Sequence, residues 1–432
     1  MKAALFLSFL LAFTSLGQNY TSYFTGNSTD ANVQALGGIC LMGGASEHDE
    51  AMKWFLQQSN GGDILVLRAS GSNGYNNYIF SQLGVTVNSV ETIVCHNAMA
   101  SQDAYVQDRI KKAEAIWFAG GDQWNYISYW RNTPVDSLIN AGLAERNIVI
   151  GGTSAGMAIQ GAYYFSAENG TVTSTTALAN PFANNVTVSN QPFLNNPQLA
   201  NVITDTHYDN PDRKGRHVAF LSRILNDFGV QGKGIACDEY TAVCIPPNGM
   251  AKIYGEYPQY DENVYFIQPN CDLIDNSPEV CTANTPLMWN RGGQALQVYH
   301  AKGTMTGEQT FDLNSWNSGD GGVWEYWYVD NGTLNITSGV APNCSQAGLT
   351  HLIEKDFQIS PNPVYAKFNI VGDLKIENVQ LYSLEGKSVD LIRLSENEFS
   401  VEGIRSGTYL LAVNSNGHVK VERLQIIAQA TN

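Results

Sequence analysis

The sequence predicts an α/β fold, in which helices flank a mostly parallel β-sheet and a small β-sandwich follows at the C-terminal end. Two patterns lead to this expectation. Between residues 38 and 150, short apolar runs alternate with amphipathic segments. Between residues 356 and 427, apolar and polar residues alternate with a period of two. A length of 432 residues is sufficient for two to three domains with a sizeable core.

Five short runs in the first part have the composition of strands that are buried on both faces. They occupy residues 39–42, 64–67, 92–95, 115–118 and 147–150. Strand, helix and strand in repetition imply a parallel sheet with helices on both faces. Because the chemistry of such sheets lies at the carboxyl ends of the strands, site residues are expected there.

Two helices are predicted between these strands. Ser46 and Asp49 resemble a capping box for the first, and Ser101 precedes the second in a similar way. The apolar residues expected to face inward are Met52, Phe55 and Leu56 in the first helix, and Val106, Ile110 and Ala113 in the second.

The later part of the chain reads mainly as β-structure and loops. Residues 169–201 are poor in charge and rich in Asn, Thr and Ala, which predicts hairpins and loops. Residues 298–336 read as strands with a dense aromatic stretch at Trp324, Tyr326, Trp327 and Tyr328. Packing between strands is favoured there over a sugar-stacking platform.

The last segment carries alternating runs at residues 376–382, 408–413 and 419–427. Glu385-Gly386 and Asn416-Gly417 supply turns between them. The segment has no cysteine and a single histidine, His418. We therefore expect a β-sandwich without chemistry of its own.

The first seventeen residues read as a signal peptide. Lys2 gives a positive start, an apolar run follows to Phe13, and Ser15 and Gly17 favour cleavage before Gln18. No later run approaches the ~18 apolar residues that a membrane span needs. We expect an exported, soluble mature chain. The formal net charge of −16 argues against nucleic acid or anionic lipid as a partner.

Seven cysteines are too few for a disulfide scaffold. Cys271 and Cys281 lie close together in a loop-like segment, so a pairing between them is one option. Cysteines in apolar, strand-like runs are expected as small core residues, namely Cys40, Cys95, Cys237 and Cys244. The sequence has no CxxC pair, no HExxH motif and no cluster of His and carboxylates, so neither a metal site nor a cofactor is predicted.

The strongest local signal for chemistry is GGTSAG at residues 151–156, directly after a predicted strand. A helix-like segment, 157–164, follows it. Strand, sharp turn and helix is the setting that exposes a nucleophilic serine, here Ser154. The amide of Ala155 is placed to donate to an oxyanion. The alternative is a glycine-rich turn with an incidental serine.

A nucleophilic serine needs a base, and this part of the chain offers His207, His217 and His300 after Ser154. His207 follows an apolar pair and is placed at a strand end. His217 opens a helical run, where a capping or surface role is expected, and His300 lies in a β stretch. Asp238 and Glu239 follow another short buried strand and supply an orienting carboxylate.

Four segments resemble motifs of the cyanophycinases and their relatives, the aspartyl dipeptidases. They are GTSAG at 152–156, FAGGDQ at 118–123, Asp205-x-His207 followed by RKGR at 213–216, and DEYTA at 238–242. The resemblance covers residues 37 to 338, and it implies a fold like that of class I glutamine amidotransferases.

The resemblance also implies residue roles. Ser154 would be the nucleophile, His207 the base and Glu239 the orienting acid. Gly121 would offer a second oxyanion amide beside that of Ala155, and the residues expected to bind substrate are Gln123, Arg213 and Arg216.

Two positions depart from the family. Cyanophycinases usually carry Gln where this chain has Thr206, and Arg where it has Pro211. Because those side chains help to hold the β-linked aspartyl-arginine substrate, cyanophycin itself is in doubt as the substrate.

The C-terminal segment resembles a type IX secretion sorting domain. The similarity lies in SPNP at 360–363, VQLYSLEGK at 379–387 and SGTYL at 406–410. It implies passage through the periplasm to the cell surface or the medium. The alternative is an adhesive β-sandwich. The expected organisation is a signal peptide (1–17), a cyanophycinase-like catalytic domain (18–343), a linker (344–355) and the sorting domain (356–432).

These observations together predict a secreted serine peptidase that cleaves aspartyl peptide bonds, with β-linked bonds as one option, through an acyl-enzyme. The partners expected are a peptide substrate and the type IX secretion machinery, and the oligomeric state is left open. Two alternatives remain. One is an inactive binding protein on the same fold, and the other is an α/β-hydrolase-type esterase, which would need His300 as its base.

Overall fold

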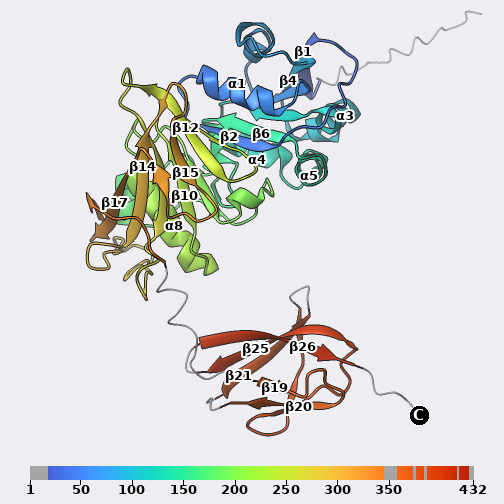
Figure 1. Cartoon of the computed structure of the whole chain (residues 1–432), viewed down its shortest axis with the longest axis vertical. Coiled ribbons are helices and arrows are strands. Elements are labelled where there is room, and N and C mark those ends of the chain that lie inside the picture. Colours follow the sequence, from blue (N-terminus) through green and yellow to red (C-terminus); the bar gives the residue numbers. More distant parts are fainter. Residues whose placement is uncertain (1–17, 345–357, 373–375, 384–386, 416–417, 428–432) are drawn as a thin grey trace, which may run out of the picture. The chain divides into compact units, whose positions relative to one another are not determined.

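The computed structural model describes residues 18–344, 358–372, 376–383, 387–415 and 418–427. The chain divides into two compact units, Met1–Cys344 and Ser345–Asn432, which run from blue to orange and in red in Figure 1. The predicted signal peptide, most of the predicted linker and the turns at 385–386 and 416–417 lie outside the described residues. Among the described residues, no helix is both long and apolar enough to cross a membrane.

The first unit is built around a ten-stranded sheet. In spatial order its strands are β1 (Tyr20–Gly26), β4 (Ser89–Cys95), β3 (Asp63–Arg68), β5 (Ala115–Phe118), β6 (Val149–Thr153), β2 (Gly38–Met42), β11 (Ala242–Ile245), β12 (Met250–Tyr257), β15 (Gln309–Asp312) and β16 (Gly319–Asp320). The five neighbours from β4 to β2 are parallel, as predicted. The strands outside them are antiparallel and were not predicted as part of this sheet.

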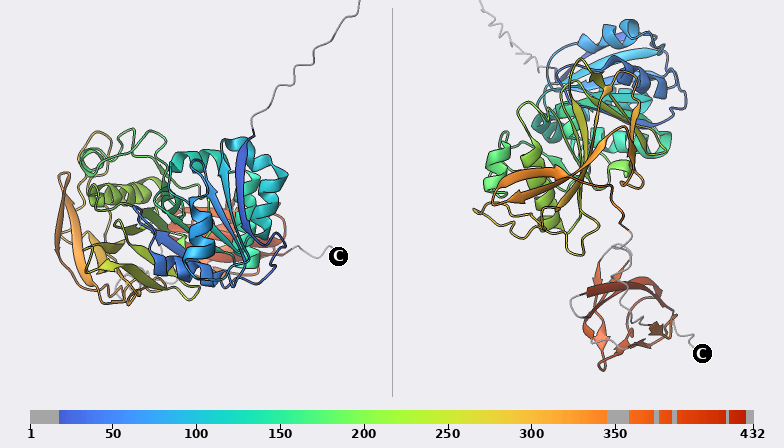
Figure 2. Two further views of the ribbon diagram at one scale, coloured as in Figure 1. Left: turned by 90° about the horizontal axis from the view of Figure 1, so that it is seen from above. Right: turned by 60° about the vertical axis from the view of Figure 1, so that its left-hand side comes forward.

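Helices cover both faces of the parallel strands, as the left view of Figure 2 shows. The helices of this part are α1 (Asp49–Gln58), α2 (Gly74–Asn77), α3 (Ala104–Lys112), α4 (Gln123–Trp130) and α5 (Pro134–Ala141). Side chains of β3 alternate between two cores. Ile64 and Val66 pack in the core that contains α1, and Leu65 and Leu67 pack in the core that contains α3, α4 and α5. This double burial explains the continuous apolar runs.

The predicted inward residues of α1 and α3 are buried, but the predicted N-caps are wrong. His48 caps α1 by accepting a hydrogen bond from the amide of Ala51, because the helix begins only at Asp49 and Ser46 lies in the turn before it. Asp103 caps α3, because the hydroxyl of Ser101 donates to a carbonyl inside the preceding 3₁₀ turn.

A second sheet of six strands completes the first unit. In order it contains β18 (Thr333–Ser338), β17 (Val323–Asp330), β14 (Leu296–Lys302), β13 (Asn263–Pro269), β10 (Lys233–Cys237) and β9 (Val202–Asp205). Only β9 and β10 pair in parallel within it. The helices of this part are α6 (Ala155–Ala158), α7 (Ser174–Ala179) and α8 (Lys214–Phe228). The segment read as hairpins and loops thus contains α7. Trp327 of β17 is fully buried, as expected of strand packing.

Short elements connect these parts. They are η1 (Tyr78–Gln82), η2 (Ala98–Gln102), η3 (Gly142–Arg146), η4 (Pro197–Leu199), β7 (Tyr164–Phe165) and β8 (Val188–Ser189).

The disulfide differs from the one considered above. Cys271 pairs with Cys344, with their Cα atoms 5.1 Å apart. Cys281 is buried instead, and its sulfur lies 3.5 Å from the hydroxyl of Ser222. The amide of Cys344 donates to Asp272, next to Cys271, so the end of the unit is drawn back onto this loop. The four cysteines assigned to the core are buried, as predicted.

The second unit holds two four-stranded sheets. One contains β19 (Gln358–Ser360), β20 (Lys367–Val371), β24 (Glu398–Ser400) and β23 (Ile392–Arg393), and the other β22 (Ser388–Val389), β21 (Ile376–Ser383), β25 (Gly407–Ser415) and β26 (His418–Ile426). Phe368 and Phe399 of the first sheet share one core with Leu381, Leu411 and Leu424 of the second. The predicted sandwich is confirmed.

Candidate active site

Ser154 lies in a sharp turn between β6 and α6. Its backbone has φ 52° and ψ −118°, a conformation that residues other than glycine rarely adopt. Its amide donates to the carbonyl of Met42 at the end of β2, over 3.1 Å. The helix α6 has only four residues, so the predicted helix at 157–164 is wrong and the chain proceeds to β7.

The glycines on either side of Ser154 are required by space. A Cβ on Gly152 would lie 2.6 Å from backbone atoms of Gly156, and a Cβ on Gly156 would lie 2.0 Å from the carbonyl oxygen of Phe118. Backbone atoms cannot yield as a flexible side chain can. The GxSxG pattern is therefore a steric condition for this turn.

His207 follows β9 and reaches Ser154 from the second sheet. Its Nε2 lies 2.8 Å from the hydroxyl oxygen of Ser154. Its φ is also positive, at 46°, and its amide donates to the carbonyl of Gly43 over 2.9 Å. A Cβ on Gly44 would lie 2.4 Å from the imidazole ring. Gly43 and Gly44 directly follow a predicted strand, and this pair of glycines is the feature of the sequence from which a close contact at this strand end could have been predicted.

Glu239 follows β10 and accepts a hydrogen bond from His207. The distance from His207 Nδ1 to Glu239 Oε1 is 2.6 Å. Asn210 Nδ2 donates to the other carboxylate oxygen over 3.3 Å. Burial works against ionisation of Glu239, but the hydrogen bonds from His207 and Asn210 outweigh it and hold its pKa below the ordinary value. Next to it, Tyr240 donates its amide to the carbonyl of Gly44.

The three side chains thus form one hydrogen-bonded line, although they come from two sheets. An ionised Glu239 only accepts hydrogen bonds, so His207 carries its proton on Nδ1 and presents a bare Nε2 to the Ser154 hydroxyl. His300 lies elsewhere. Its Nε2 is 3.2 Å from Glu325, so His300 does not act as the base for Ser154, as the α/β-hydrolase alternative would need.

The predicted oxyanion donors are available. Within the described residues, neither the amide of Gly121 nor that of Ala155 donates a hydrogen bond. The turn that carries Gly121 is close to the serine, because a Cβ on Gly120 would lie 3.7 Å from the Cβ of Ser154. Tyr126 holds this turn with a hydroxyl that contacts the carbonyl oxygens of two of its residues, over 2.9 and 3.0 Å.

Gln123 and Arg213 lie near the triad but already have protein partners. Gln123 Nε2 donates to the carbonyl of Phe165 over 3.0 Å. Arg213 Nη1 donates to the carbonyl of Thr206, next to His207, over 2.9 Å. Within the described residues the other guanidinium nitrogens of Arg213 have no hydrogen-bond partner, so this side chain retains donors for a ligand.

Arg216 departs from the expectation of substrate binding. Its side chain is 3% exposed, and Nε and Nη2 both donate to the carboxylate of Asp205, over 2.8 and 2.5 Å. Nη1 contacts Thr171 and the carbonyl of Val172. Every guanidinium nitrogen is therefore occupied. The physical reason is Asp205, a buried carboxylate that requires a counter-ion.

His217 also departs from its predicted capping or surface role. It is fully buried, and neither ring nitrogen has a hydrogen-bond partner in the described part of the chain. Burial lowers its pKa to about 4.

Comparison with known proteins gives two family matches. Residues 39–249, which include Ser154, His207 and Glu239, match peptidase family S51. Residues 358–427 match the secretion system C-terminal sorting domain.

Among curated proteins, the chain is similar to the cyanophycinase of Geminocystis herdmanii, with 25% identity over 170 residues, and to that of Trichormus variabilis, with 23% identity over 209 residues. These alignments cover 38% and 48% of this chain and 58% and 62% of the relatives. The chain therefore spans about three fifths of the length of these relatives.

Two solved structures are similar at low identity. A peptidase from an acI-B1 Actinobacterium gives a TM-score of 0.39 at 15% identity, covering 54% of this chain and 91% of that one. A putative peptidase E protein from Listeria monocytogenes gives 0.33 at 16% identity, covering 51% and 100%. The first unit of this chain therefore carries a match to peptidase family S51, and its second unit carries a match to the secretion system C-terminal sorting domain.

Proposed function

We propose that this chain is a secreted serine peptidase that hydrolyses aspartyl peptide bonds, β-linked bonds included, through an acyl-enzyme. The observation that carries the proposal is the line from Ser154 Oγ to His207 Nε2 (2.8 Å) and from His207 Nδ1 to Glu239 Oε1 (2.6 Å). Both distances are within hydrogen-bond reach before any substrate binds.

In the first half of the reaction, Ser154 Oγ attacks the carbonyl carbon of the scissile bond and His207 Nε2 takes its proton. The negative charge that develops on the carbonyl oxygen is stabilised by the amides of Gly121 and Ala155. The imidazolium then donates its proton to the departing amine, and an ester on Ser154 remains. Glu239 stays ionised and stabilises the imidazolium, in keeping with its lowered pKa.

In the second half, His207 removes a proton from water, and the resulting hydroxide attacks the ester. Collapse of this intermediate releases the new carboxyl group and returns the proton to Ser154. All of these steps use groups of this chain and one water molecule.

The substrate class is supported by charge near the triad. Arg213 lies seven residues from Thr206, whose carbonyl it contacts, and keeps free guanidinium donors. A guanidinium can donate two parallel hydrogen bonds to a carboxylate such as that of an aspartyl residue. The names of the related cyanophycinases support the same class. Since Thr206 and Pro211 replace family side chains, short aspartyl peptides are favoured over cyanophycin.

Room for a ligand exists at the same edge of the sheet. A cavity of about 390 Å³ is lined by Arg68 at the end of β3, and by Ser46 and Glu47 just after Gly44. It therefore offers charges of both signs close to the loop that contacts His207.

Export is supported by the sorting domain at residues 358–427. We propose that the type IX secretion machinery recognises it and delivers the peptidase to the cell surface or the medium, after residues 1–17 have directed the chain to the periplasm.

The test combines labelling with turnover. A fluorophosphonate should label the wild-type chain and should not label Ser154→Ala, and a panel of α- and β-aspartyl dipeptides should be hydrolysed by the wild type alone. A wild type that is neither labelled nor active on any member of the panel, while remaining folded, would favour the inactive binding protein instead.

A further inference from the structure

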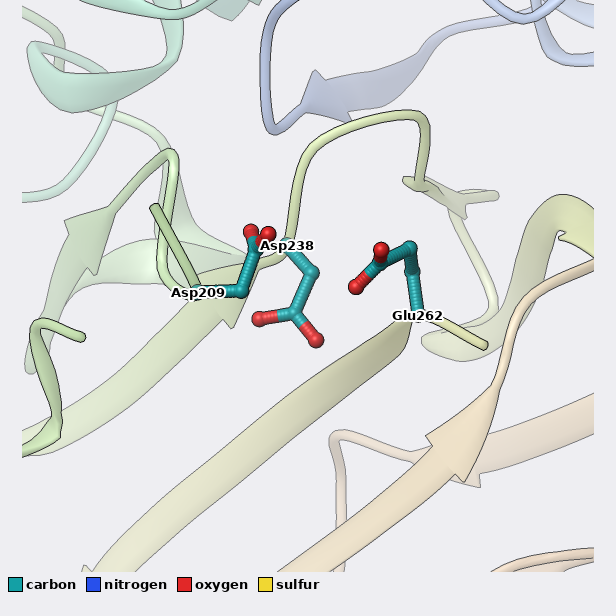
Figure 3. Close-up of side chains that lie close together, drawn as sticks. All are labelled: Asp209, Asp238 and Glu262. Carbon is teal, nitrogen blue, oxygen red and sulfur yellow. The ribbon is translucent and has the colours of Figure 1, made fainter. Parts of the chain in front are cut away.

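Three carboxylates meet next to Glu239 of the triad, whose amide donates a hydrogen bond to one of them. Asp209 lies in the loop after His207, Asp238 directly follows β10, and Glu262 directly precedes β13. One oxygen of each lies within 4.8 Å of one oxygen of the others. Figure 3 shows the three side chains lying close together. Because the three carboxylates are far apart in the sequence, no short motif predicts that they meet.

Asp238 is the side chain that needs a partner. It is 2% exposed, and within the described residues its Oδ1 has no hydrogen-bond partner. Its Oδ2 accepts one hydrogen bond, from the amide of Asn263 over 2.8 Å. A buried carboxylate oxygen without a partner is costly, because burial removes its water and nothing replaces it.

The surrounding protein supplies no cation at contact distance. None of the three carboxylates forms an ion pair within the part of the chain that is described. Lys214 pairs instead with Asp212 over 2.9 Å and lies over the rings of Tyr208 and Tyr265. Lys302 pairs with Asp261 over 2.7 Å. Both lysines act on the carboxylates from a distance, so within the described residues the cluster has no cation in contact with it.

We propose that Asp209, Asp238 and Glu262 bind one divalent cation of the calcium type. The ligand set contains only carboxylate oxygens, which hard cations prefer, and no nitrogen or sulfur that would favour zinc. Calcium–oxygen bonds of about 2.3–2.6 Å place two ligands of one ion up to about 5 Å apart. The spacing in the cluster fits this limit. This site replaces the expectation from the sequence that the chain has no metal site.

The cation also positions the triad acid, an inference that rests on the proposed function. Asp209 Oδ1 accepts a hydrogen bond from the amide of Glu239 over 2.8 Å, and Asp238 precedes Glu239 in the chain. An ion shared by Asp209, Asp238 and Glu262 ties the His207 loop to the ends of β10 and β13. Glu239 then keeps its orientation toward His207. In this role the three carboxylates are positioning residues.

A proton is the competing occupant. Without a cation, burial, together with repulsion from Asp209 and Glu262, raises the pKa of Asp238 to about 7. A protonated Asp238 would relieve the repulsion with no metal. The experiment below separates the two occupants.

The test uses the full chain after treatment with a chelator and removal of the chelator. Calcium chloride is titrated by isothermal calorimetry and by thermal unfolding, at a pH of about 7.5. We expect one calcium ion per chain and a rise in Tm with calcium concentration. Magnesium should bind more weakly, because it demands a tighter octahedral geometry. Preferred binding of zinc, or no calcium binding at all, would overturn the proposal.

Matched variants locate the site. Glu262→Gln should weaken calcium binding roughly tenfold or more, because it removes one charged ligand. Asp261→Asn is the control. Asp261 is the neighbour of Glu262 in the chain, but its own carboxylate is 79% exposed and pairs with Lys302, so this variant should bind calcium as the wild type does. Asp209→Asn provides a second ligand variant if Glu262→Gln folds poorly. Calcium binding that survives both ligand variants would place the ion elsewhere and overturn the site.

The experiments can distinguish a failure of the cation site from a failure of the proposed peptidase function. Ser154→Ala should bind calcium as the wild type does, because the site does not include the nucleophile. Calcium should restore kcat to chelator-treated wild type with little change in KM. If calcium binds without any change in kcat, the positioning role is overturned. If calcium does not bind but fluorophosphonate still labels Ser154, the cation site is overturned and the proposed function stands.

Discussion

Ser154 and His207 come from two different sheets, yet their amides donate to successive carbonyl groups at the end of β2, those of Met42 and Gly43. Both residues have positive φ angles, 52° and 46°. One strand end therefore sets the positions of the nucleophile and the base, and the 2.8 Å contact between their side chains follows from the backbone. We therefore expect substitutions at this strand end to lower activity more than they lower the stability of the fold.

The first prediction concerns the triad. Ser154→Ala and His207→Ala should each lower kcat by on the order of 10⁴-fold, because either change removes the activated nucleophile. Glu239→Gln should keep the Tm near that of the wild type but lower kcat by a comparable factor, since an amide no longer fixes the tautomer of the His207 imidazole. Steady-state kinetics on an aspartyl dipeptide, with circular dichroism as the folding control, checks this.

His300→Ala serves as the comparison for the triad variants. His300 contacts Glu325 and stacks on Tyr265, so its loss should leave kcat within a few-fold of the wild type. An effect as large as that of His207→Ala would make the Ser, acid, His order the better description.

The second prediction concerns Gly44. A Cβ there would lie 2.4 Å from the His207 ring, and its φ of 113° suits only glycine. Gly44→Ala should push the imidazole away from Ser154 and lower kcat by roughly 10²-fold or more, as a misplacement near 1 Å does. Gly84→Ala is the control, because its φ is also positive, at 72°, and a Cβ at that position meets nothing within 4 Å. Equal losses in the two variants would contradict the steric argument.

The parts of the fold that the sequence predicted correctly are those that local pattern encodes. Strands such as β3 and β5 are buried on both faces, so residues 64–67 of β3 and all four residues of β5 are apolar, and these runs are visible without knowing the neighbouring strands. The turn at Ser154 is visible for a similar reason, because its glycines are required within a few residues of the serine.

The parts that were missed depend on partners far along the chain. Arg216 reads as an available cation until Asp205 is known to be buried beside it. Cys271 pairs with a residue 73 positions away instead of with its near neighbour Cys281. The antiparallel strands that extend the first sheet, and the carboxylate cluster with Asp238, likewise arise only when distant segments meet.

The third prediction revises the role of Arg216. Arg216→Ala should destabilise the fold by about 3–5 kcal/mol, because it leaves the carboxylate of Asp205 buried without a counter-ion. Arg216→Met combined with Asp205→Asn removes both charges and should recover much of this loss. Urea unfolding of the three proteins measures it. A stable Arg216→Ala with a raised KM would restore the substrate-binding role instead.

The fourth prediction concerns acid stability. The pKa of His217 is about 4 in the folded chain and near its ordinary 6.5 when unfolded. As the pH falls from 6.5 to 4, the unfolded chain takes up a proton that the folded chain does not, so stability present above pH 6.5 is lost. At about 1.4 kcal/mol per pKa unit, this contribution is on the order of 3 kcal/mol.

His217→Leu removes the titrating group and two buried nitrogens that have no partner in the described residues. We expect little change in the free energy of unfolding at pH 7 and a flatter decline between pH 6.5 and 4. Urea titrations at three pH values test this. An unchanged decline in the variant would assign the acid sensitivity to other groups.

The last prediction concerns specificity, which depends on the loop that follows His207. Arg213 keeps free guanidinium donors beside the Thr206 carbonyl, whereas Pro211 offers no donor where the related family carries an arginine. Arg213→Ala should lower kcat/KM on a β-aspartyl dipeptide by roughly 10²-fold, which corresponds to ~2.7 kcal/mol of lost transition-state binding. The wild type should turn over this dipeptide better than cyanophycin.

Pro211→Arg should shift that preference toward cyanophycin, because it returns a guanidinium that can hold a side chain of the polymer. The position is exposed, and circular dichroism is the folding control for the variant. The deciding measurement is the ratio of kcat/KM on cyanophycin to that on the β-aspartyl dipeptide, in the wild type and in Pro211→Arg. A wild type that already prefers cyanophycin would show that the missing arginine is unimportant. In that case the cavity beside Arg68 and Glu47 is the next candidate for the source of specificity, and Arg68→Ala, in place of Pro211→Arg, is the variant whose ratio is compared with that of the wild type.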